Sequence, residues 1–197
     1  MYRKYFKRLI DFLLSLIGII IICPILIILA ILIKLNSKGP ILFKQKRLGE
    51  GGEAFFIYKF RTMVVNAENI GDGLKVKSES DSRITKVGKV LRKLSLDELP
   101  QLFNVIVGNM SLVGPRPPVT YHPYDGYENY PGWAKKRFEV KPGITGYAQV
   151  KVRNNASWDE RIKYDNKYVN NVTLVNDLKI LIETILVVFK SKDIYKS

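Results

Sequence analysis

The sequence has a single cysteine, Cys23, and a single histidine, His122, among 197 residues. One cysteine cannot form an intramolecular disulfide or a metal site built from several thiolates. One histidine leaves little room for sites in which an imidazole activates a serine or a cysteine. Carboxylates and arginines must therefore carry any chemistry of this chain.

Acidic residues are also scarce, since 18 Asp and Glu stand against 32 Lys and Arg and the formal net charge is +14. This excess predicts attraction to polyanions, among them nucleic acids, anionic lipids and nucleotide diphosphates. The length is enough for one folded domain with a hydrophobic core of its own.

Charge is absent from residues 12–33, which are mostly aliphatic and long enough to span a bilayer as a helix. Pro24 follows Cys23 near the middle of this run, where proline removes a backbone donor and crowds the preceding turn. Basic residues flank both ends, and the positive-inside rule favours both ends on the cytoplasmic side. Two alternatives follow for residues 1–38: a re-entrant helix that breaks at Cys23–Pro24, or a kinked single-pass anchor.

Residues 39–197 are expected to form a cytoplasmic body of mixed α/β structure, rich in helix, with a small β-hairpin. Residues 41–49 and 54–61 read as the two strands of that hairpin, joined by a glycine-rich turn. Period-two alternation places Lys59 and Arg61 on one face, either facing an anionic substrate or forming a basic edge exposed to solvent or lipid. We further expect a helix over 83–94, a short strand over 147–152, and a C-terminal amphipathic helix that either packs on the core or lies in the membrane interface.

Two adjacent carboxylates, Asp97 and Glu98, follow Ser95 at the start of a helix expected over 96–107. The spacing S-x-x-E is that of a capping box, which gives a complete structural reason for Ser95 and Glu98. The alternative is catalytic. A helix N-terminus favours an ionised Asp97, which can attack phosphorus, while Glu98 can ligate Mg²⁺.

Arginines flank this carboxylate pair in the sequence. Arg92 lies on a different face of its helix from Lys86 and Lys93, which makes it a candidate for a substrate phosphate. Prolines on both sides of Arg116 keep the backbone extended, so that its guanidinium is placed to bind a diphosphate. The alternative for Arg116 is a surface side chain on a structural turn.

Several blocks of the sequence together resemble one known family. They are the basic N-terminus and apolar run with its central Pro24, GPILFKQKRLGEGGEAFFIYKFRTM (39–63), LRKLSLDELPQLFNVIVGNMSLVGPRP (91–117), KPGITGYAQVKVRNN (141–155) and WDERIKYDNKYVNN (158–171). With these blocks the chain resembles the bacterial sugar transferases that are small monotopic polyprenyl-phosphate phosphoglycosyl transferases. The resemblance covers nearly the whole chain.

This resemblance implies transfer of a sugar-1-phosphate from a UDP-sugar to undecaprenyl phosphate, with release of UMP, at the cytoplasmic face of the bacterial inner membrane. It implies that Asp97 is the nucleophile, that Glu98 with Asp97 supports Mg²⁺, and that Arg153 contacts the nucleotide. It also favours the re-entrant form of the anchor, with the break at Pro24. The reaction would start a surface glycan such as a capsule, exopolysaccharide, O-antigen or glycoprotein glycan.

The alternative from another class is a non-catalytic, membrane-tethered basic module that binds anionic lipid or nucleic acid. Its basic residues are dispersed and no nucleic-acid motif is present, so we expect no nucleic-acid partner. Anionic membrane lipids remain expected partners, because basic residues near a membrane surface are attracted to their headgroups. The sequence leaves the transferred sugar, the pathway and the oligomeric state open, with a homodimer among the alternatives.

Overall fold

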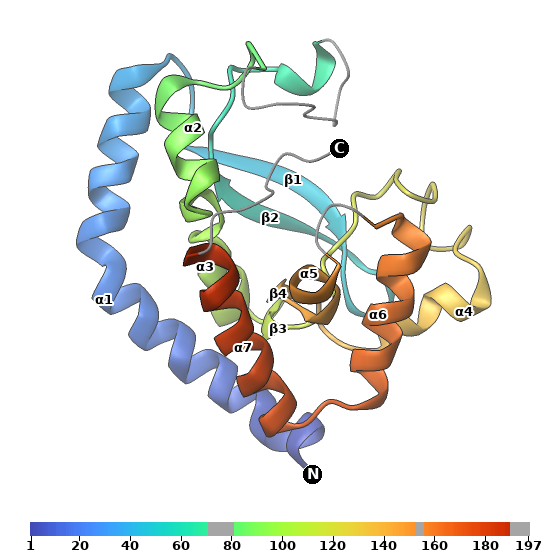
Figure 1. Ribbon diagram of the computed structural model, residues 1–197. Coiled ribbons are helices and arrows are strands. Elements are labelled where there is room, and N and C mark those ends of the chain that lie inside the picture. The colour runs from blue at the N-terminus through green and yellow to red at the C-terminus, as the bar shows by residue number, and fades with distance from the viewer. Residues whose placement is uncertain (71–80, 153–155, 190–197) are drawn as a thin grey trace.

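The computed structural model describes residues 1–70, 81–152 and 156–189 (Figure 1). Its longer helices are α1 (Lys7–Asn36), α2 (Lys86–Lys93), α3 (Gln101–Val107), α6 (Trp158–Asn170) and α7 (Leu174–Phe189). Its strands are β1 (Leu42–Leu48), β2 (Ala54–Phe60), β3 (Ser111–Val113) and β4 (Gly143–Thr145). Short helical segments are η1 (Tyr2–Phe6), η2 (Glu50–Gly52), η3 (Ala67–Asn69), η4 (Leu96–Glu98), α4 (Gly132–Lys135), η5 (Lys136–Glu139) and α5 (Tyr147–Lys151). The expected mixture of many helices and small sheets is confirmed.

The apolar N-terminal run forms one long helix along an edge of the molecule (Figure 1). Within the described residues, the segment Tyr2–Asn36 is long and apolar enough to cross a membrane, and most of its side chains are exposed. The helix continues through Pro24, and its axis changes direction near the middle of α1 (Figure 1). A bend is the usual result when proline removes one hydrogen bond from a helix. The re-entrant topology and the boundary at residue 38 stay predictions.

The predicted hairpin is confirmed, with β1 and β2 paired antiparallel from Leu42 opposite Phe60 to Leu48 opposite Ala54. Ile57 on β2 is buried against Val105 and Met110, which places this side of the hairpin on α3. Lys59 has the same orientation as Ile57, because side chains two residues apart share a face. The hairpin therefore directs Lys59 towards the segment just before α3.

The second sheet is a short parallel pair, β3 and β4, and glycines allow its close approach. A Cβ on Gly114 would lie 2.3 Å from the carbonyl oxygen of Lys141, and one on Gly143 would lie 2.1 Å from the Gly114 nitrogen. These distances are too short for any side chain. The two motifs that contain these glycines are therefore joined backbone to backbone.

The strand predicted over 147–152 is wrong, because these residues form the short helix α5. Tyr147 and Val150 both pack against the cluster that contains Tyr168 and Ile180. Two packed residues at a spacing of three fit one face of a helix, whereas the residues of a strand alternate between its faces. Tertiary packing thus decided a segment whose composition favoured a strand.

Helix α7 has both a buried and an exposed apolar side. Ile180 and Asp177 are buried in the body, whereas Leu178, Ile182 and Ile185 are exposed. The two alternatives for this helix are therefore not exclusive. It packs on the core through one side and presents an apolar surface on the other.

Candidate active site

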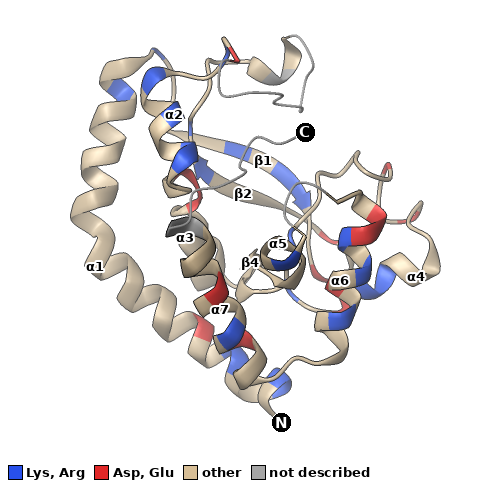
Figure 2. Ribbon diagram, viewed as in Figure 1, with Lys and Arg blue, Asp and Glu red and all other residues tan. Residues whose placement is uncertain are grey.

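A cavity of about 630 Å³ brings together residues from β2, α2, η4, α3, α5, α6 and α7. Its charged lining residues are Lys59, Arg92, Lys93, Asp97, Glu98, Arg116, Arg137, Arg161 and Asp165. Lys and Arg lie on the strands and helices around the middle of the molecule, whereas the middle of α1 carries none (Figure 2). The positive charge of the cavity lining suits an anionic ligand.

The carboxylate pair lies on the short 3₁₀ segment η4, and the predicted capping box is wrong. Ser95 has a φ of 55°, in the left-handed region, and its side chain makes no cap hydrogen bond. The α-helix begins only at Gln101, after Pro100. Ser95 therefore marks a sharp turn between α2 and η4, and Glu98 makes its contacts across the cavity. A left-handed non-glycine residue is uncommon and often lies near a functional site.

Glu98 binds two basic side chains through one carboxylate oxygen. Lys59 Nζ donates to Glu98 Oε1 at 2.5 Å, and Arg116 Nη2 donates to the same oxygen at 3.0 Å. Burial raises the pKa of Glu98, but the charges of Arg116 and Lys59 outweigh it and hold that pKa well below its usual range. Burial in turn lowers the pKa of Lys59, whereas the charge of Glu98 raises the pKa of Arg116. Glu98 is thus ionised and fixed in place.

Asp97 differs from its neighbour. Burial raises its pKa, and the Glu98 charge adds to this, while Lys59, Arg92 and Arg116 act in the opposite direction. Among the described residues, no hydrogen bond or ion pair holds the Asp97 carboxylate. A carboxylate in a cationic cavity with its oxygens unengaged is a potential nucleophile or metal ligand.

The residues around η4 fit a bound Mg²⁺. Both carboxylate oxygens of Asp97, together with Glu98 Oε2, are oxygen ligands of the kind that Mg²⁺ prefers, and both residues line the cavity. The described residues contain no cluster of three or more metal-binding side chains. Mg²⁺ does not need one, because it typically binds through one or two carboxylates together with substrate phosphates and water.

The structure brings five of the predicted site residues to one cavity, and Arg61 is not among them. Lys59, Arg92, Asp97, Glu98 and Arg116 all line it. Arg61 does not, because its guanidinium donates to the carbonyls of Ser37 and Lys38 at 2.8 Å, directly after α1. This role is structural: Arg61 satisfies carbonyls beyond the helix end.

Two further predictions concern other parts of the chain. Arg153 lies outside the described residues. Cys23 and Pro24 lie in the middle of α1, and Cys23 is exposed.

The cavity residues without a role assigned from the sequence include Arg137, Trp158, Arg161 and Asp165. Arg137 and Asp165 form an ion pair at 2.8 Å with almost no solvent exposure. The guanidinium carbons of Arg137 and Arg161 lie 5.7 and 5.5 Å from the centre of the Trp158 ring. No local signal distinguishes Arg137 from the surrounding lysines and glutamate, because the pairing depends on a residue far along the chain.

Part of the cavity wall is apolar. It is formed by Leu99, Leu102, Leu112, Ile144, Leu181 and Val187. The cavity therefore offers an ionic region at η4 and an apolar region between α3 and α7. Such a division suits a ligand with a charged head and a hydrocarbon tail.

Comparison with known protein families identifies the family of this chain. A family model described as "Bacterial sugar transferase" matches residues 2–191. The chain belongs to the bacterial sugar transferase family. This membership agrees with the resemblance that the sequence blocks indicated.

Three similar proteins have names that describe their activity or process. The galactosyl transferase CpsE of Streptococcus agalactiae serotype III is 44% identical over 192 residues, which cover 92% of this chain and 42% of CpsE. A Klebsiella pneumoniae UDP-glucose:undecaprenyl-phosphate glucose-1-phosphate transferase is 41% identical over 195 residues, covering 96% of this chain and 41% of that enzyme. The exopolysaccharide production protein ExoY of Sinorhizobium fredii is 38% identical over 202 residues, covering 96% of this chain and 88% of ExoY. The chain thus spans about two fifths of the length of the first two relatives and most of the third.

Proposed function

We propose that this protein transfers a sugar-1-phosphate from a UDP-sugar to undecaprenyl phosphate and releases UMP. The observation that carries the proposal is the Asp97 carboxylate, unengaged in a cationic cavity beside a fixed Glu98. The names of the transferases from Klebsiella pneumoniae and other bacteria support the same acceptor and type of donor. The product would enter the assembly of a surface polysaccharide or other glycan.

The reaction proceeds in two displacements. An Asp97 oxygen attacks the β-phosphorus of the UDP-sugar, the bond from that phosphorus to the bridging oxygen breaks, and UMP leaves. A phosphosugar–aspartyl intermediate remains, in which the Asp97 carboxyl and the sugar phosphate are joined as an acyl phosphate. A phosphate oxygen of undecaprenyl phosphate then attacks the same phosphorus, which forms the diphosphate-linked product and regenerates the Asp97 carboxylate. Splitting one transfer into two steps is characteristic of covalent catalysis.

The cationic side chains of the cavity assist by binding phosphate oxygens. Arg116 and Arg92, which both line the cavity, would neutralise the diphosphate, and Arg116 is oriented by its bond to Glu98. The charge of Lys59 lowers the pKa of Asp97, so the nucleophile stays ionised down to a lower pH. Preorganised charges of this kind stabilise the charge that develops in phosphoryl transfer.

Asp97 and Glu98 are also the residues that would hold Mg²⁺ together with the substrate phosphates. When bound, the ion would supply further neutralisation of the phosphate oxygens.

The acceptor would reach the cavity from the membrane. The apolar wall formed by Leu99, Leu102, Leu181 and Val187 suits a polyprenyl chain, and the exposed surfaces of α1 and α7 suit a lipid environment. We place α1 as a re-entrant helix in the inner membrane, with the body on the cytoplasmic face. The basic residues at both ends of α1 support this orientation.

Release of UMP tests this function. Purified protein is mixed with each of a panel of UDP-sugars, undecaprenyl phosphate and Mg²⁺. We expect UMP release from at least one sugar, and we expect EDTA or omission of the lipid to stop multiple turnover. Turnover in EDTA would remove the metal from the proposal, and an absence of release from every sugar would contradict the activity.

A further inference from the structure

Four successive carbonyls around Arg116 are each held by a donor from another part of the chain. Prolines 115, 117 and 118 have no N–H, so this segment has few donors of its own. The carbonyl of Pro115 accepts from Gly143 N at 2.9 Å, that of Arg116 from Arg137 Nη2 at 2.7 Å, that of Pro117 from Arg47 Nη1 at 2.9 Å, and that of Pro118 from Leu48 N at 3.0 Å. The backbone of Arg116 is therefore fixed from outside.

Of these four donor residues, Arg137 is the one that lines the cavity. Its Nη2 donates to the Arg116 carbonyl and forms an ion pair with Asp165 Oδ2 at 2.8 Å. The side chains of Arg137 and Asp165 are only 1% and 3% exposed. Arg137 comes from η5 and Asp165 from α6, and both elements are separate in sequence from the proline segment.

A continuous chain of contacts runs from this pair to the carboxylates. Asp165 orients Arg137, Arg137 holds the backbone of Arg116, and the Arg116 guanidinium donates to Glu98. Aromatic rings restrict Arg137 further, because its guanidinium carbon lies 5.5 Å from the centre of the Phe138 ring and 5.7 Å from that of Trp158.

We infer that Arg137, held by Asp165, is a positioning residue for Arg116. This inference rests on the proposed function, in which Arg116 binds the diphosphate. Arg137 sets where the Arg116 guanidinium stands relative to Asp97 and Glu98, through the carbonyl of Arg116. The competing interpretation is a buried ion pair that only stabilises the fold.

Paired substitutions separate these interpretations. Arg137→Met alone leaves Asp165 buried without its partner and is expected to lower stability. In the double variant Arg137→Met/Asp165→Leu both charges are gone, and replacing a buried ion pair with apolar side chains is often neutral or stabilising. The double variant should therefore recover the wild-type unfolding midpoint while the Arg116 carbonyl still lacks its donor.

We expect the double variant to remain impaired despite its recovered stability. A misplacement of about 1 Å at a reacting group can cost about 100-fold in rate, so kcat/KM for the UDP-sugar should fall roughly 10- to 100-fold. Recovery of kcat/KM together with stability would overturn the positioning role.

A double-mutant cycle tests whether Arg137 acts through Arg116. Introducing Arg116→Ala into the double variant should lower kcat/KM little beyond Arg116→Ala alone, because residues of one network are not additive. Full additivity would contradict the inference. Arg83→Met is a matched control, since Arg83 is a buried arginine that pairs with Asp81 and donates to the carbonyls of Ala67 and Ile70, away from the cavity. It should lower stability without a selective effect on kcat/KM.

Calorimetric binding of UDP with Mg²⁺ gives a second readout that needs no turnover. The affinity for UDP should fall in the double variant and stay near the wild-type value in folded Arg83→Met. An unchanged affinity in the double variant would count against the inference. An inactive wild type would contradict the proposed function, whereas an active wild type with additive variants would contradict only the role of Arg137.

Discussion

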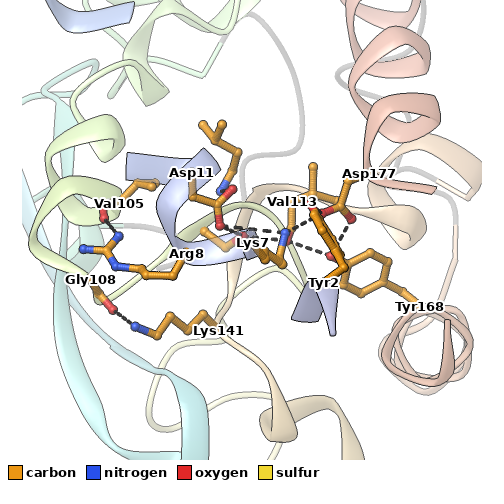
Figure 3. A network of polar contacts seen from close by, with 12 residues as sticks. Tyr2, Lys7, Arg8, Asp11, Val105, Gly108, Val113, Lys141, Tyr168 and Asp177 are labelled. Carbon is orange, nitrogen blue, oxygen red and sulfur yellow. Dashed lines mark hydrogen bonds and ion pairs between the residues drawn. The ribbon is translucent and has the colours of Figure 1, made fainter. Parts of the chain in front are cut away.

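Networks of buried or partly buried charge lie at the first turns of α1 and at the cavity beside η4. In the first region, Lys7 Nζ lies 2.6 Å from Asp177 Oδ2 and 3.8 Å from Asp11 Oδ2 (Figure 3). Asp177 also accepts from the hydroxyls of Tyr2 at 2.7 Å and Tyr168 at 2.8 Å. Both oxygens of this carboxylate are engaged.

The charged residues at the first turns of α1, with their partners, form the α1 network. The other charged groups of this network also have their hydrogen bonds satisfied. Asp11 accepts from Ser111 Oγ at 2.7 Å and from Leu112 N at 3.3 Å. Arg8 donates to the carbonyls of Val105 and Ile106 at the end of α3 (Figure 3). These contacts join α1 to α3, β3 and α7, and they stabilise the fold.

The cavity network begins in the same way but leaves one group unengaged. Glu98 is bound by Lys59 and Arg116, whereas Asp97 has no hydrogen bond or ion pair within the described part of the chain. Asp97 also faces a cavity of about 630 Å³. Buried charge alone therefore does not identify an active site. A carboxylate with open oxygens and room for a substrate does.

The largest effect that this comparison predicts is on catalysis at Asp97. Asp97→Asn keeps the shape of the side chain but removes the nucleophile, so the rate of UMP release should fall by about 1000-fold or more. The unfolding midpoint should change little, since no hydrogen bond is lost. A rate close to that of the wild type would show that Asp97 does not attack the phosphorus.

A substitution in the α1 network should lower the stability of the protein and leave its activity unchanged. Lys7→Met leaves Asp177 buried without its cation and is expected to lower the free energy of unfolding by roughly 3–5 kcal/mol. Denaturant unfolding in detergent or nanodiscs measures this loss. The kcat/KM per folded molecule should be retained, and a selective fall in kcat/KM would mean that the two networks are not separate in function.

A smaller effect is expected on the pH dependence of activity. The ionised form of Asp97 is the nucleophile, so kcat/KM should fall as the pH drops through its pKa, which burial holds above the ordinary value of 3.8. Lys59 lowers that pKa, and Lys59→Met should therefore shift the acid limb of the profile to higher pH. Arg92→Met should shift the limb in the same direction. An unmoved limb in both variants would assign it to a different group.

The elements set by local signals could be predicted from the sequence. The hairpin was correct because period-two alternation and a glycine-rich turn both lie within a few residues. The long helix 7–36 follows from an uninterrupted apolar run. Lys59, Arg92 and Arg116 are predicted from the sequence to bind substrate, and the structure places them around one cavity with Asp97 and Glu98.

The errors arose where distant contacts decide the outcome. Ser95 has the sequence of a cap, but α2 and η4 meet at a left-handed turn there. Arg61 shares its face with Lys59 in the strand pattern, yet the carbonyls after α1 bind its guanidinium. Arg137 could not be found at all, because its partner Asp165 comes from another helix.

The most direct test of the cavity as a covalent phosphosugar transferase site is the intact mass of the protein after incubation with a UDP-sugar and Mg²⁺, without undecaprenyl phosphate. We predict release of one UMP per protein molecule and a mass increase of one sugar phosphate, located by peptide mapping on Asp97 and absent from Asp97→Asn. An active enzyme that shows no adduct, and that releases UMP only when the lipid acceptor is present, would contradict it.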